Sequence, residues 1–365
     1  MWTRLALELI VKYQQSPLRA ARTLALLHAS MHDAHFASAA VADDGVLNAI
    51  AVHRSAGEVL GHLYPQEPEG RLAGFGLARA ASLIRAGTPA HKNADQHLRI
   101  GEAVAARAIA RALSDGADAR WHVAARPTLQ AGQWRAAPPL NLYDPLEPLA
   151  GTWRPWLTGS SDLAASVPPP HAYGDAAWSG ELMEVLATAR RLGAADKAIA
   201  ERWNLDRGTV TPAGVWNLIA MAELERANAP VGRTAAVLAA VNVAMADAFI
   251  ACWQVKFKWW TERPITAIRD QLDANFLSHL LTPPFPSYVS GHATISGAAA
   301  VVLGAFFQAR ADWLRTQAEE AAHSRLLGGI HFRSDNDAGL ALGRAIGEQV
   351  VGRVRETSRD QDAAR

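Results

Sequence analysis

Apolar side chains recur at every third or fourth position through most of the chain, and Gly and Pro punctuate the joints between these runs. This spacing predicts amphipathic helices that each bury one face. The chain shows no convincing strand pattern, so we predict an all-α fold built from helical bundles. The predicted helical segments cover residues 3–14, 17–41, 51–64, 69–87, 94–116, 179–194, 194–205, 212–229, 233–260, 309–329 and 336–358, and one more begins near His292.

Residues 120–175 break this pattern, because they lack a period and are rich in Pro, Gly and Trp. A long loop inside a compact domain is usually functional or packed as a lid. We expect Trp134, Trp153 and Trp156 to pin this segment to the helical body rather than to stack on a ligand. The prediction is one all-α domain over 1–365, with helical halves at 1–119 and 196–357, an irregular connecting region at 120–195, and the functional site in the second half.

The composition is that of an ordinary globular protein: 50% of the 365 residues are hydrophobic, 19% are charged, and the formal net charge is +1. This balance gives no reason to expect nucleic acid or an anionic membrane as a partner. Cys252 is the single cysteine, which excludes an internal disulfide and a cysteine-based zinc site. Its apolar neighbours indicate a buried structural thiol rather than a nucleophile.

Residues 234–253 come nearest to a membrane span, but Asn242 and Asp247 interrupt them. A span needs roughly 18 to 20 apolar residues, so we expect a buried core helix here. The first residues lack the apolar core and the cleavage site of a signal peptide. The sequence as it stands therefore predicts a cytoplasmic protein, with an export signal upstream of Met1 left open.

The stretch KFKWWTERP places two cations near each other. Lys256 and Arg263 are seven residues apart, so two helical turns would bring both to one face. Pro264 disfavours the helical region for the residue before it, which puts Arg263 at a helix end. Two fixed cations side by side suit an oxyanion such as phosphate, although Lys and Arg at a helix end are more often solvated.

The triplet Ser290, Gly291 and His292 lies where the chain changes from Pro-rich to small and apolar. Ser290 is predicted to be the N-cap of a buried helix, whose free N–H groups and positive dipole end form an anion site. Gly291 allows a close approach to the backbone. From this stretch alone, the alternative is a plain capped helix with His292 on its surface.

The stretch HSRLLGGIHFRSDNDAG brings a third cation near a His–Asp pair. Gly328 and Gly329 interrupt the chain between Arg325 and His331, and Asp335 follows His331 by four residues. An Asp bonded to one imidazole nitrogen fixes the tautomer and leaves the other nitrogen to act as nucleophile or ligand. An isolated pair of this kind is more often part of a polar surface. Together with the two preceding stretches, however, it predicts a cage for a tetrahedral or trigonal-bipyramidal oxyanion.

The three stretches Lys256–Pro264, Ser290–His292 and Ser324–Asp335 resemble a known three-part signature, in the same order and with the same internal spacing. Type 2 phosphatidic acid phosphatases, bacterial acid phosphatases and vanadium-dependent haloperoxidases share it. The longer stretches ADAFIACWQVKFKWWTERPITAIRD, AARTLALLHASMHDA and PAGVWNLIAMAE resemble the soluble bacterial haloperoxidases and extend the likeness over most of the chain. The resemblance implies the helical fold of that superfamily.

The resemblance also implies a vanadate cofactor, hydrogen peroxide and halide as substrates, and a hypohalous acid equivalent as product. His331 would be the vanadium ligand, and His292 the acid–base that assists peroxide binding and O–O cleavage. Lys256 would polarise the peroxide. The residues that would hold the vanadate oxygens are Lys256, Arg263, Ser290, Gly291 and Arg325.

Further implications concern the surroundings of the cage and its partners. Asp335 would support His331, and Trp253 and Phe285 match aromatic positions that line the pocket of the chloroperoxidases. A small organic acceptor is a possible further partner. Ala-rich helices and exposed Trp residues make a homodimer plausible.

Two alternatives remain open for the same residues. In a phosphatase acting on phosphomonoesters, His331 would attack phosphorus and form a phosphohistidine, while His292 would protonate the leaving oxygen. In a helical oxyanion-binding protein, the cage would hold its anion without turnover. Vanadate and phosphate share charge and geometry, so the cage residues do not separate these functions.

Three residues depart from the family pattern. Val289 stands where Pro often precedes Ser-Gly-His, which bears on the rigidity of that loop. Gln254 stands where many bacterial relatives carry an acid. Ser334 replaces a common bulky aromatic beside Asp335, which we expect to loosen the support of His331.

A few polar residues outside the three stretches carry predictions of their own. Asp247 lies in an apolar helix, and we expect it to pair with one of the cage arginines. His323 could approach the cage. His28 and His32 are four apart and could chelate zinc, but no Glu lies between them as in a zincin motif, and packing is the preferred interpretation.

Overall fold

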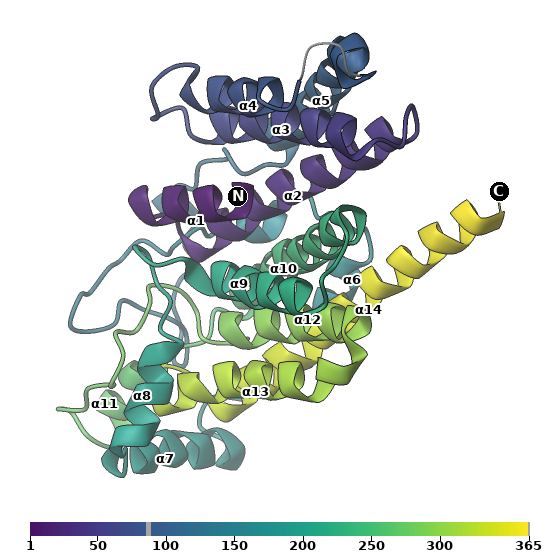
Figure 1. Ribbon diagram of the computed structural model, residues 1–365. Helices are drawn as coiled ribbons and strands as arrows, with labels where there is room; N and C mark the ends of the chain where they lie inside the picture. The colour runs from purple at the N-terminus through teal and green to yellow at the C-terminus, as the bar shows by residue number, and fades with distance from the viewer. Residues whose placement is uncertain (85–88, 364–365) are drawn as a thin grey trace. The chain divides into compact units, whose positions relative to one another are not determined.

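The structure is a computed structural model that describes residues 1–84 and 89–363 of the chain (Figure 1). Over these residues it contains helices and no strand, apart from one isolated bridge between Gln133 and Thr261. The predicted all-α fold is therefore confirmed. Residues 85–87 of the predicted helical segment 69–87 lie outside the described residues.

The helices group into two compact units. Unit 1 comprises Met1–Ala117 and Arg207–Val243, and unit 2 comprises Asp118–Asp206 and Ala244–Arg365. The predicted division into halves and a connecting region follows other boundaries and stays a prediction. Unit 1 holds α1 (Trp2–Lys12), α2 (Pro17–Ala39), α3 (Gly45–Leu63), α4 (Arg71–Ala81), α5 (Pro89–Ser114), α9 (Thr211–Arg226) and the first part of α10 (Val231–Trp259).

Unit 2 carries the three signature stretches. One of its helices, α11, was not predicted, and the Pro-rich region contains short helical turns instead of being wholly irregular. Its elements are η1 (Val123–Ala125), η2 (Ala150–Thr152), α6 (Ser160–Ala165), α7 (Ala176–Arg190), α8 (Ala194–Arg202), the rest of α10, α11 (Pro264–Gln271), α12 (Gly291–Phe306), η3 (Gln308–Arg310), α13 (Ala311–Leu327) and α14 (Arg333–Ala363).

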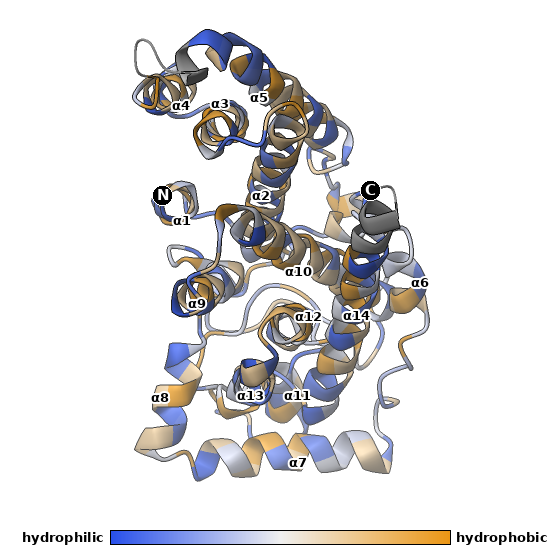
Figure 2. Cartoon of the chain, turned by 45° about the vertical axis from the view of Figure 1, so that its right-hand side comes forward, coloured by the Kyte–Doolittle hydropathy of each residue, from blue (hydrophilic) through white to orange (hydrophobic). Residues whose placement is uncertain are grey.

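Helix α10 is long and apolar enough to cross a membrane by length and composition. Its most apolar window is 83% buried inside the protein, and Figure 2 shows apolar residues along its length. In unit 1 the amides of Asn217 and Asn242 bond to each other at 2.7 and 2.8 Å, so the polar interruption at Asn242 is satisfied inside the core. These features agree with the predicted core helix.

Helices α12 and α14 of unit 2 pack backbone against backbone. A Cβ on Gly343 would lie 2.0 Å from the carbonyl oxygen of Thr294, and one on Gly297 would lie 2.8 Å from that of Leu340. The absence of side chains at these positions allows the two helices to approach this closely. At the start of α12 the Ser290 N–H donates to the carbonyl of Asp335 at 2.9 Å, so the packing joins two signature stretches.

Asp247 fastens the Pro-rich region to α10. Its carboxylate accepts hydrogen bonds from the N–H groups of Trp156 and Leu157, at 2.7 and 2.9 Å, and from the Ser160 hydroxyl at 2.8 Å. The prediction that Asp247 pairs with a cage arginine was therefore wrong, because backbone N–H groups of the loop and the Ser160 hydroxyl are its hydrogen-bond partners instead. Trp134 and Trp153 are buried, as predicted for residues that pin this region.

Candidate active site

Lys256 and Arg263 meet in unit 2 from two different elements. Helix α10 ends at Trp259, and Arg263 is the N-cap of α11 with extended backbone angles of −91° and 151°. The effect expected from Pro264 is confirmed, and the two cations face the same way as predicted, although the chain turns at Trp260 instead of continuing as one helix. Both cations lie over the ring of Phe285, at 5.1 Å for Lys256 Nζ and 4.7 Å for Arg263 Cζ.

Backbone carbonyl oxygens position the two cations. Lys256 Nζ donates to the carbonyls of Pro286 and Ser287 at 2.8 and 2.7 Å. Arg263 Nε and Nη1 donate to the carbonyls of Phe285 and Ile330, both at 2.8 Å. Carbonyl dipoles fix the direction of a cation but leave its net charge uncompensated.

Arg325 is held in the same way in the last turn of α13. Its Nη2 donates to the carbonyls of Ala200 and Trp203 at 3.3 and 2.7 Å, and its Nε contacts the Ser324 hydroxyl at 3.1 Å. Arg325 is 2% exposed, and Lys256 and Arg263 are fully buried. Unit 2 therefore buries three basic side chains, and the acids whose charges act on them are Asp335, for Lys256 and Arg263, and Asp206, for Arg325.

The cost of burying these charges is visible in their pKa values. Burial lowers the pKa of Lys256 to about 7, with Arg263 as a further cause. Burial likewise lowers the pKa of Arg263 and of Arg325 to about 9. Asp335 is the buried acid that opposes the shifts of Lys256 and Arg263. A bound anion would supply the missing negative charge and restore the charged forms.

Ser290 caps α12, as predicted. Its hydroxyl accepts a hydrogen bond from the Ala293 N–H at 3.4 Å, and the helix begins at Gly291. A Cβ on Gly291 would lie 3.4 Å from Phe249 and 3.5 Å from Trp253, so aromatic rings stand against the helix start. The positive end of α12 thus lies in an apolar, buried setting, where it attracts an anion most strongly.

Asp335 fixes the tautomer of His331. The distance from His331 Nδ1 to Asp335 Oδ2 is 2.8 Å, and Arg263 Nη1 lies 3.0 Å from His331 Nε2. Since Arg263 can act only as a donor, Nε2 must accept, and the proton is on Nδ1. Burial and the neighbouring Arg263 hold the pKa of His331 well below its usual range, so the ring is neutral and its Nε2 lone pair faces the cations.

Ser287 and the start of α14 support this pair. The Ser287 hydroxyl donates to Asp335 Oδ2 at 2.5 Å, and the Phe332 N–H donates to the same oxygen at 3.1 Å. Burial raises the pKa of Asp335 to about 6, while these donors and Lys256 oppose the shift. Sequence reasoning missed Ser287, although its position three residues before Ser290 was the available signal.

Two buried nitrogen atoms of the cage have no hydrogen-bond partner among the described residues, Arg263 Nη2 and His292 Nε2. Burial, followed by the charge of Arg325, keeps the pKa of His292 well below its ordinary value, so this ring is neutral as well. Unpaired buried polar atoms are costly unless a ligand meets them. Three buried cations, a helix N-terminus and an unprotonated imidazole nitrogen fit a vanadate group that needs oxygen-binding donors and one nitrogen ligand.

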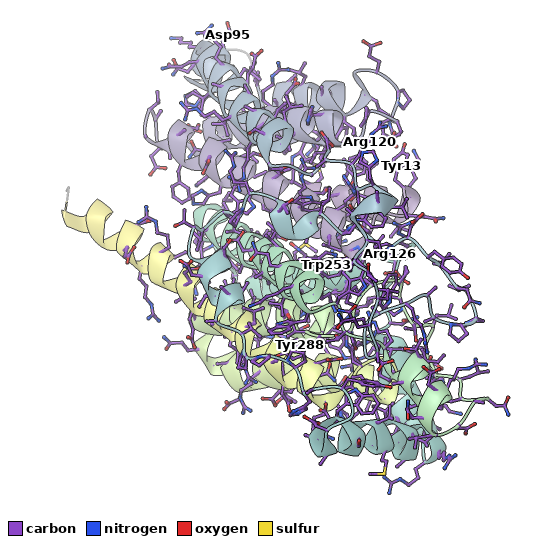
Figure 3. All side chains as sticks on the ribbon, turned by 180° about the vertical axis from the view of Figure 1, so that it is seen from behind. Tyr13, Asp95, Arg120, Arg126, Trp253 and Tyr288 are labelled. Atoms are coloured by element: carbon purple, nitrogen blue, oxygen red, sulfur yellow. The ribbon has the colours of Figure 1, made fainter. Side chains whose placement is uncertain are left out.

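Trp253 and Phe285 form an aromatic wall beside the cage. Their ring centroids are 4.9 Å apart, and Trp253 Nε1 donates to the Leu146 carbonyl at 3.2 Å (Figure 3 labels Trp253). Lys256 Nζ lies 5.7 Å from the Trp253 ring. The predicted pocket residues therefore border the cations.

Two of the departures from the family pattern are compensated by contacts that are distant in sequence. The Ser334 N–H and hydroxyl donate to the two carboxylate oxygens of Glu181 in α7, at 2.6 and 2.7 Å. The expected loosening at Ser334 is therefore wrong, since α7 fastens the start of α14. Next to Val289, the Tyr288 N–H donates to Thr261 Oγ1 at 2.8 Å and holds the loop in place of a proline.

Other candidate residues do not join the cage. His323 is exposed on α13, so its expected approach to the cage was wrong. His28 is buried in unit 1, 3.4 Å from Thr3 Oγ1. No group of three or more His, Cys, Asp or Glu side chains within the described residues could hold a metal ion, and the zinc alternative has no support. Cys252 is buried, and burial raises the pKa of its thiol, as expected for a structural cysteine.

Comparisons with known proteins show what this chain is similar to. Residues 236–318 and 307–360 match the family model described as VCPO second helical-bundle domain. No curated protein matches the chain. A bacterial vanadium-dependent iodoperoxidase is similar in structure, with a TM-score of 0.77, 24% identity, and coverage of 96% of this chain and 94% of that chain.

A bacterial vanadium-dependent chloroperoxidase is similar in two forms. Its holo form has a TM-score of 0.68 and 14% identity, and covers 95% of this chain and 92% of that chain. Its apo form has a TM-score of 0.70 and 16% identity, and covers 93% of each chain. These likenesses establish that the chain has the helical fold of the vanadium haloperoxidases.

Proposed function

We propose that this protein is a vanadate-dependent haloperoxidase, which oxidises halide with hydrogen peroxide to a hypohalous acid equivalent. The observation that carries the proposal is the buried set of Lys256, Arg263 and Arg325 around a neutral His331, with Arg263 Nη2 left without a hydrogen-bond partner among the described residues. The fold shared with vanadium-dependent iodo- and chloroperoxidases supports vanadate as the anion.

The residues of the cage divide the work of holding this group. His331 Nε2 would be its nitrogen ligand, because Asp335 keeps the proton on Nδ1. Lys256, Arg263, Arg325 and the start of α12 at Ser290 and Gly291 would bind its oxygens. When bound, vanadate supplies a permanently oxidised Lewis acid that activates hydrogen peroxide toward attack by halide.

His292 and Lys256 would handle protons and charge. His292 is buried and neutral, so its Nε2 can accept a proton from hydrogen peroxide and later return it to a leaving oxygen. Lys256 would donate a hydrogen bond to the peroxide, since two of its three donor positions already point at fixed carbonyls. Phe285 and Trp253 would exclude water, which strengthens each of these interactions.

The proposal also covers the organic acceptor of the reaction and the assembly of the protein. The hypohalous acid equivalent would pass to a small organic acceptor, which is halogenated in turn. A homodimer is the proposed assembly, and sedimentation velocity at several protein concentrations would test it by the mass of the sedimenting species.

The proposal is tested by reconstitution. The purified protein is loaded with orthovanadate and supplied with hydrogen peroxide and bromide or iodide, and halogenation of a phenolic dye is followed. Vanadate-dependent turnover is expected, and no halogenation by the loaded protein would overturn the proposal. Hydrolysis of para-nitrophenyl phosphate by the vanadate-free protein is measured in parallel, because efficient hydrolysis without halogenation would favour a phosphatase.

A further inference from the structure

A second cavity of unit 2 lies on the far side of the His331–Asp335 pair. About 40 Å³ of it is accessible to the centre of a water molecule, and it opens to the surface at Tyr173, which is 45% exposed. Tyr288, labelled in Figure 3, lies in the loop before α12 and forms part of its wall. The cavity is lined by the aromatic rings of Tyr173, Trp178, Tyr288 and Phe332 and by the carboxylates of Glu181, Glu262 and Asp335.

Glu262 is the least compensated group of this cavity. It is 5% exposed, its Oε1 has no hydrogen-bond partner in the described part of the chain, and its Oε2 accepts a hydrogen bond from Thr266 Oγ1 at 3.4 Å. Burial raises its pKa to about 7, and Arg135, a cation that opposes this shift, is paired with Asp270. A cation from outside the chain would stabilise the charged form of this buried carboxyl and could satisfy its unpaired Oε1.

The other two carboxylates are satisfied by neutral donors. Glu181 accepts from the Ser334 N–H and hydroxyl, while the nearby cation Arg333 is paired with Glu184. Burial and then the charges of Asp335 and Glu181 raise the pKa of Tyr288 to about 12. Both acids therefore act electrostatically on this residue of the cavity lining. The cavity therefore gathers three acidic side chains beside His171, whereas the cage beyond His331 holds three basic ones.

The aromatic side of the cavity is fixed in place. The rings of Tyr173 and Trp178 are 4.8 Å apart, and Gln271 Nε2 contacts the Tyr173 hydroxyl at 3.1 Å. The Tyr288 hydroxyl donates to the Pro168 carbonyl at 2.7 Å. Ring faces beside carboxylates favour an organic cation, which gains from both the π systems and the negative charge.

We propose that this cavity binds a small organic ammonium compound, with its amino group against Glu262 and its carbon part against Tyr173 and Trp178. The described residues offer no group of three acidic or histidine side chains for a metal ion, which favours an organic cation. The inference holds whether or not the protein is a haloperoxidase, because none of its evidence involves the cage cations.

The arrangement around His331 predicts that the ammonium compound and the oxyanion bind together. His331 Nδ1 faces Asp335, which lines the cavity, and its Nε2 faces Arg263. The two sites therefore lie on opposite sides of one imidazole ring. Calorimetric titration with 2-phenylethylammonium is expected to give one site per chain, both with and without saturating orthovanadate. Loss of ammonium binding when vanadate is present would contradict this placement.

A charge comparison on the unmodified protein tests the proposal without any substitution. 2-Phenylethanol has nearly the same shape but no charge, and it is expected to bind at least about tenfold more weakly than 2-phenylethylammonium. Equal affinity for the two compounds, or no binding of the ammonium compound, would overturn the proposal.

A matched pair of variants locates the site. Glu262→Gln removes the charge with little change in shape and is expected to lower the affinity for 2-phenylethylammonium by about tenfold or more. Glu225→Gln, at an exposed position of unit 1, is expected to leave the affinity unchanged. Circular dichroism verifies that both variants are folded. A folded Glu262→Gln protein with the affinity of the unmodified protein would place the ammonium compound elsewhere and refute the assignment.

Discussion

Two buried polar clusters, one in each unit, differ in how their hydrogen bonds are satisfied. In unit 1, Asn217 and Asn242 bond to each other and to the carbonyls of Ala213 and Leu238, at 2.7 to 2.9 Å. In unit 2, Arg263 Nη2 and His292 Nε2 are buried without a partner among the described residues. The first cluster is complete within the chain, whereas the second needs a ligand.

The difference separates polar groups that stabilise the fold from polar groups that serve binding. A satisfied amide pair costs the protein little and fixes how two helices pack. Burial of cations that are held by carbonyl oxygens destabilises their charged forms, as the lowered pKa values of Lys256, Arg263 and Arg325 show. Proteins keep such destabilising buried charges mainly where they are needed for function.

The largest expected effect comes from removing the imidazole that faces the cations. His331→Ala is expected to reduce vanadate-dependent halogenation by about 10²- to 10³-fold or more, because a ligand and its hydrogen bonds to Arg263 and Asp335 are lost. Steady-state rates at saturating hydrogen peroxide and bromide measure this loss. His323→Ala, an exposed histidine on α13, is the control and should keep full activity. Near-normal activity of His331→Ala would exclude His331 as the ligand.

A substitution in the satisfied cluster should act on stability instead. Asn217→Ala leaves the Asn242 amide with unmade bonds in the core, and a loss of about 1–3 kcal/mol in the free energy of unfolding is expected. Urea unfolding measures the loss. The halogenation rate per folded molecule should stay unchanged. A large fall in that rate would contradict the claim that the Asn217–Asn242 cluster stabilises the fold without serving the reaction.

The third prediction uses pH. Burial lowers the pKa of Lys256 to about 7 from 10.5, so above pH 7 the unfolded chain holds a proton that the folded chain has lost. The stability of the anion-free protein should therefore rise with pH above this value. Affinity for sulfate, whose charge is constant over this range, should fall by up to about tenfold per pH unit as Lys256 becomes neutral.

Calorimetry of sulfate binding at several pH values measures this fall. Lys256→Gln should weaken binding and flatten its pH dependence, and Asn217→Ala should leave the dependence in place. An affinity that does not change between pH 7 and pH 9, close to the lowered pKa values of about 7 and 9 for Lys256 and Arg263, would contradict the assigned cause.

The smallest effect is expected where α7 fastens α14. Ser334→Ala removes the hydroxyl bond to Glu181 and keeps the backbone bond, so a loss of about 0.5–1.5 kcal/mol in stability is expected, with a small decrease in vanadate affinity. Thermal unfolding with and without vanadate measures both. A collapse of vanadate binding in this variant would mean that Ser334 supports His331 more directly than its contacts indicate.

Local features of the site could be predicted from the sequence. The N-cap at Ser290 and the extended backbone at Arg263 follow from residues next to them, and both are confirmed. The helical fold follows from periodicity and from the resemblance, and it is confirmed by the structure and by its similarity to vanadium haloperoxidases. The cytoplasmic location, the homodimer and the individual roles of the cage residues stay predictions.

Contacts between distant residues could not be predicted in this way. Asp247 binds backbone N–H groups about ninety positions earlier in the chain, and Glu181 binds Ser334 across 153 positions. A single sequence does not indicate which distant loop or helix packs against such a residue. The turn between Lys256 and Arg263 could not be predicted for a different reason, since Trp260, with a φ of 54°, is neither Gly nor Pro.

Calorimetric titration of orthovanadate into the unmodified protein and into Arg263→Leu tests the central claim most directly. The unmodified protein should bind one vanadate per chain, and Arg263→Leu should weaken binding by about 10²-fold or more, because a cation with an unpaired Nη2 is removed from the cage. Circular dichroism of both proteins controls for folding. Absence of binding by the unmodified protein, or equal binding by both, would contradict the claim that the buried cations of unit 2 form an oxyanion site.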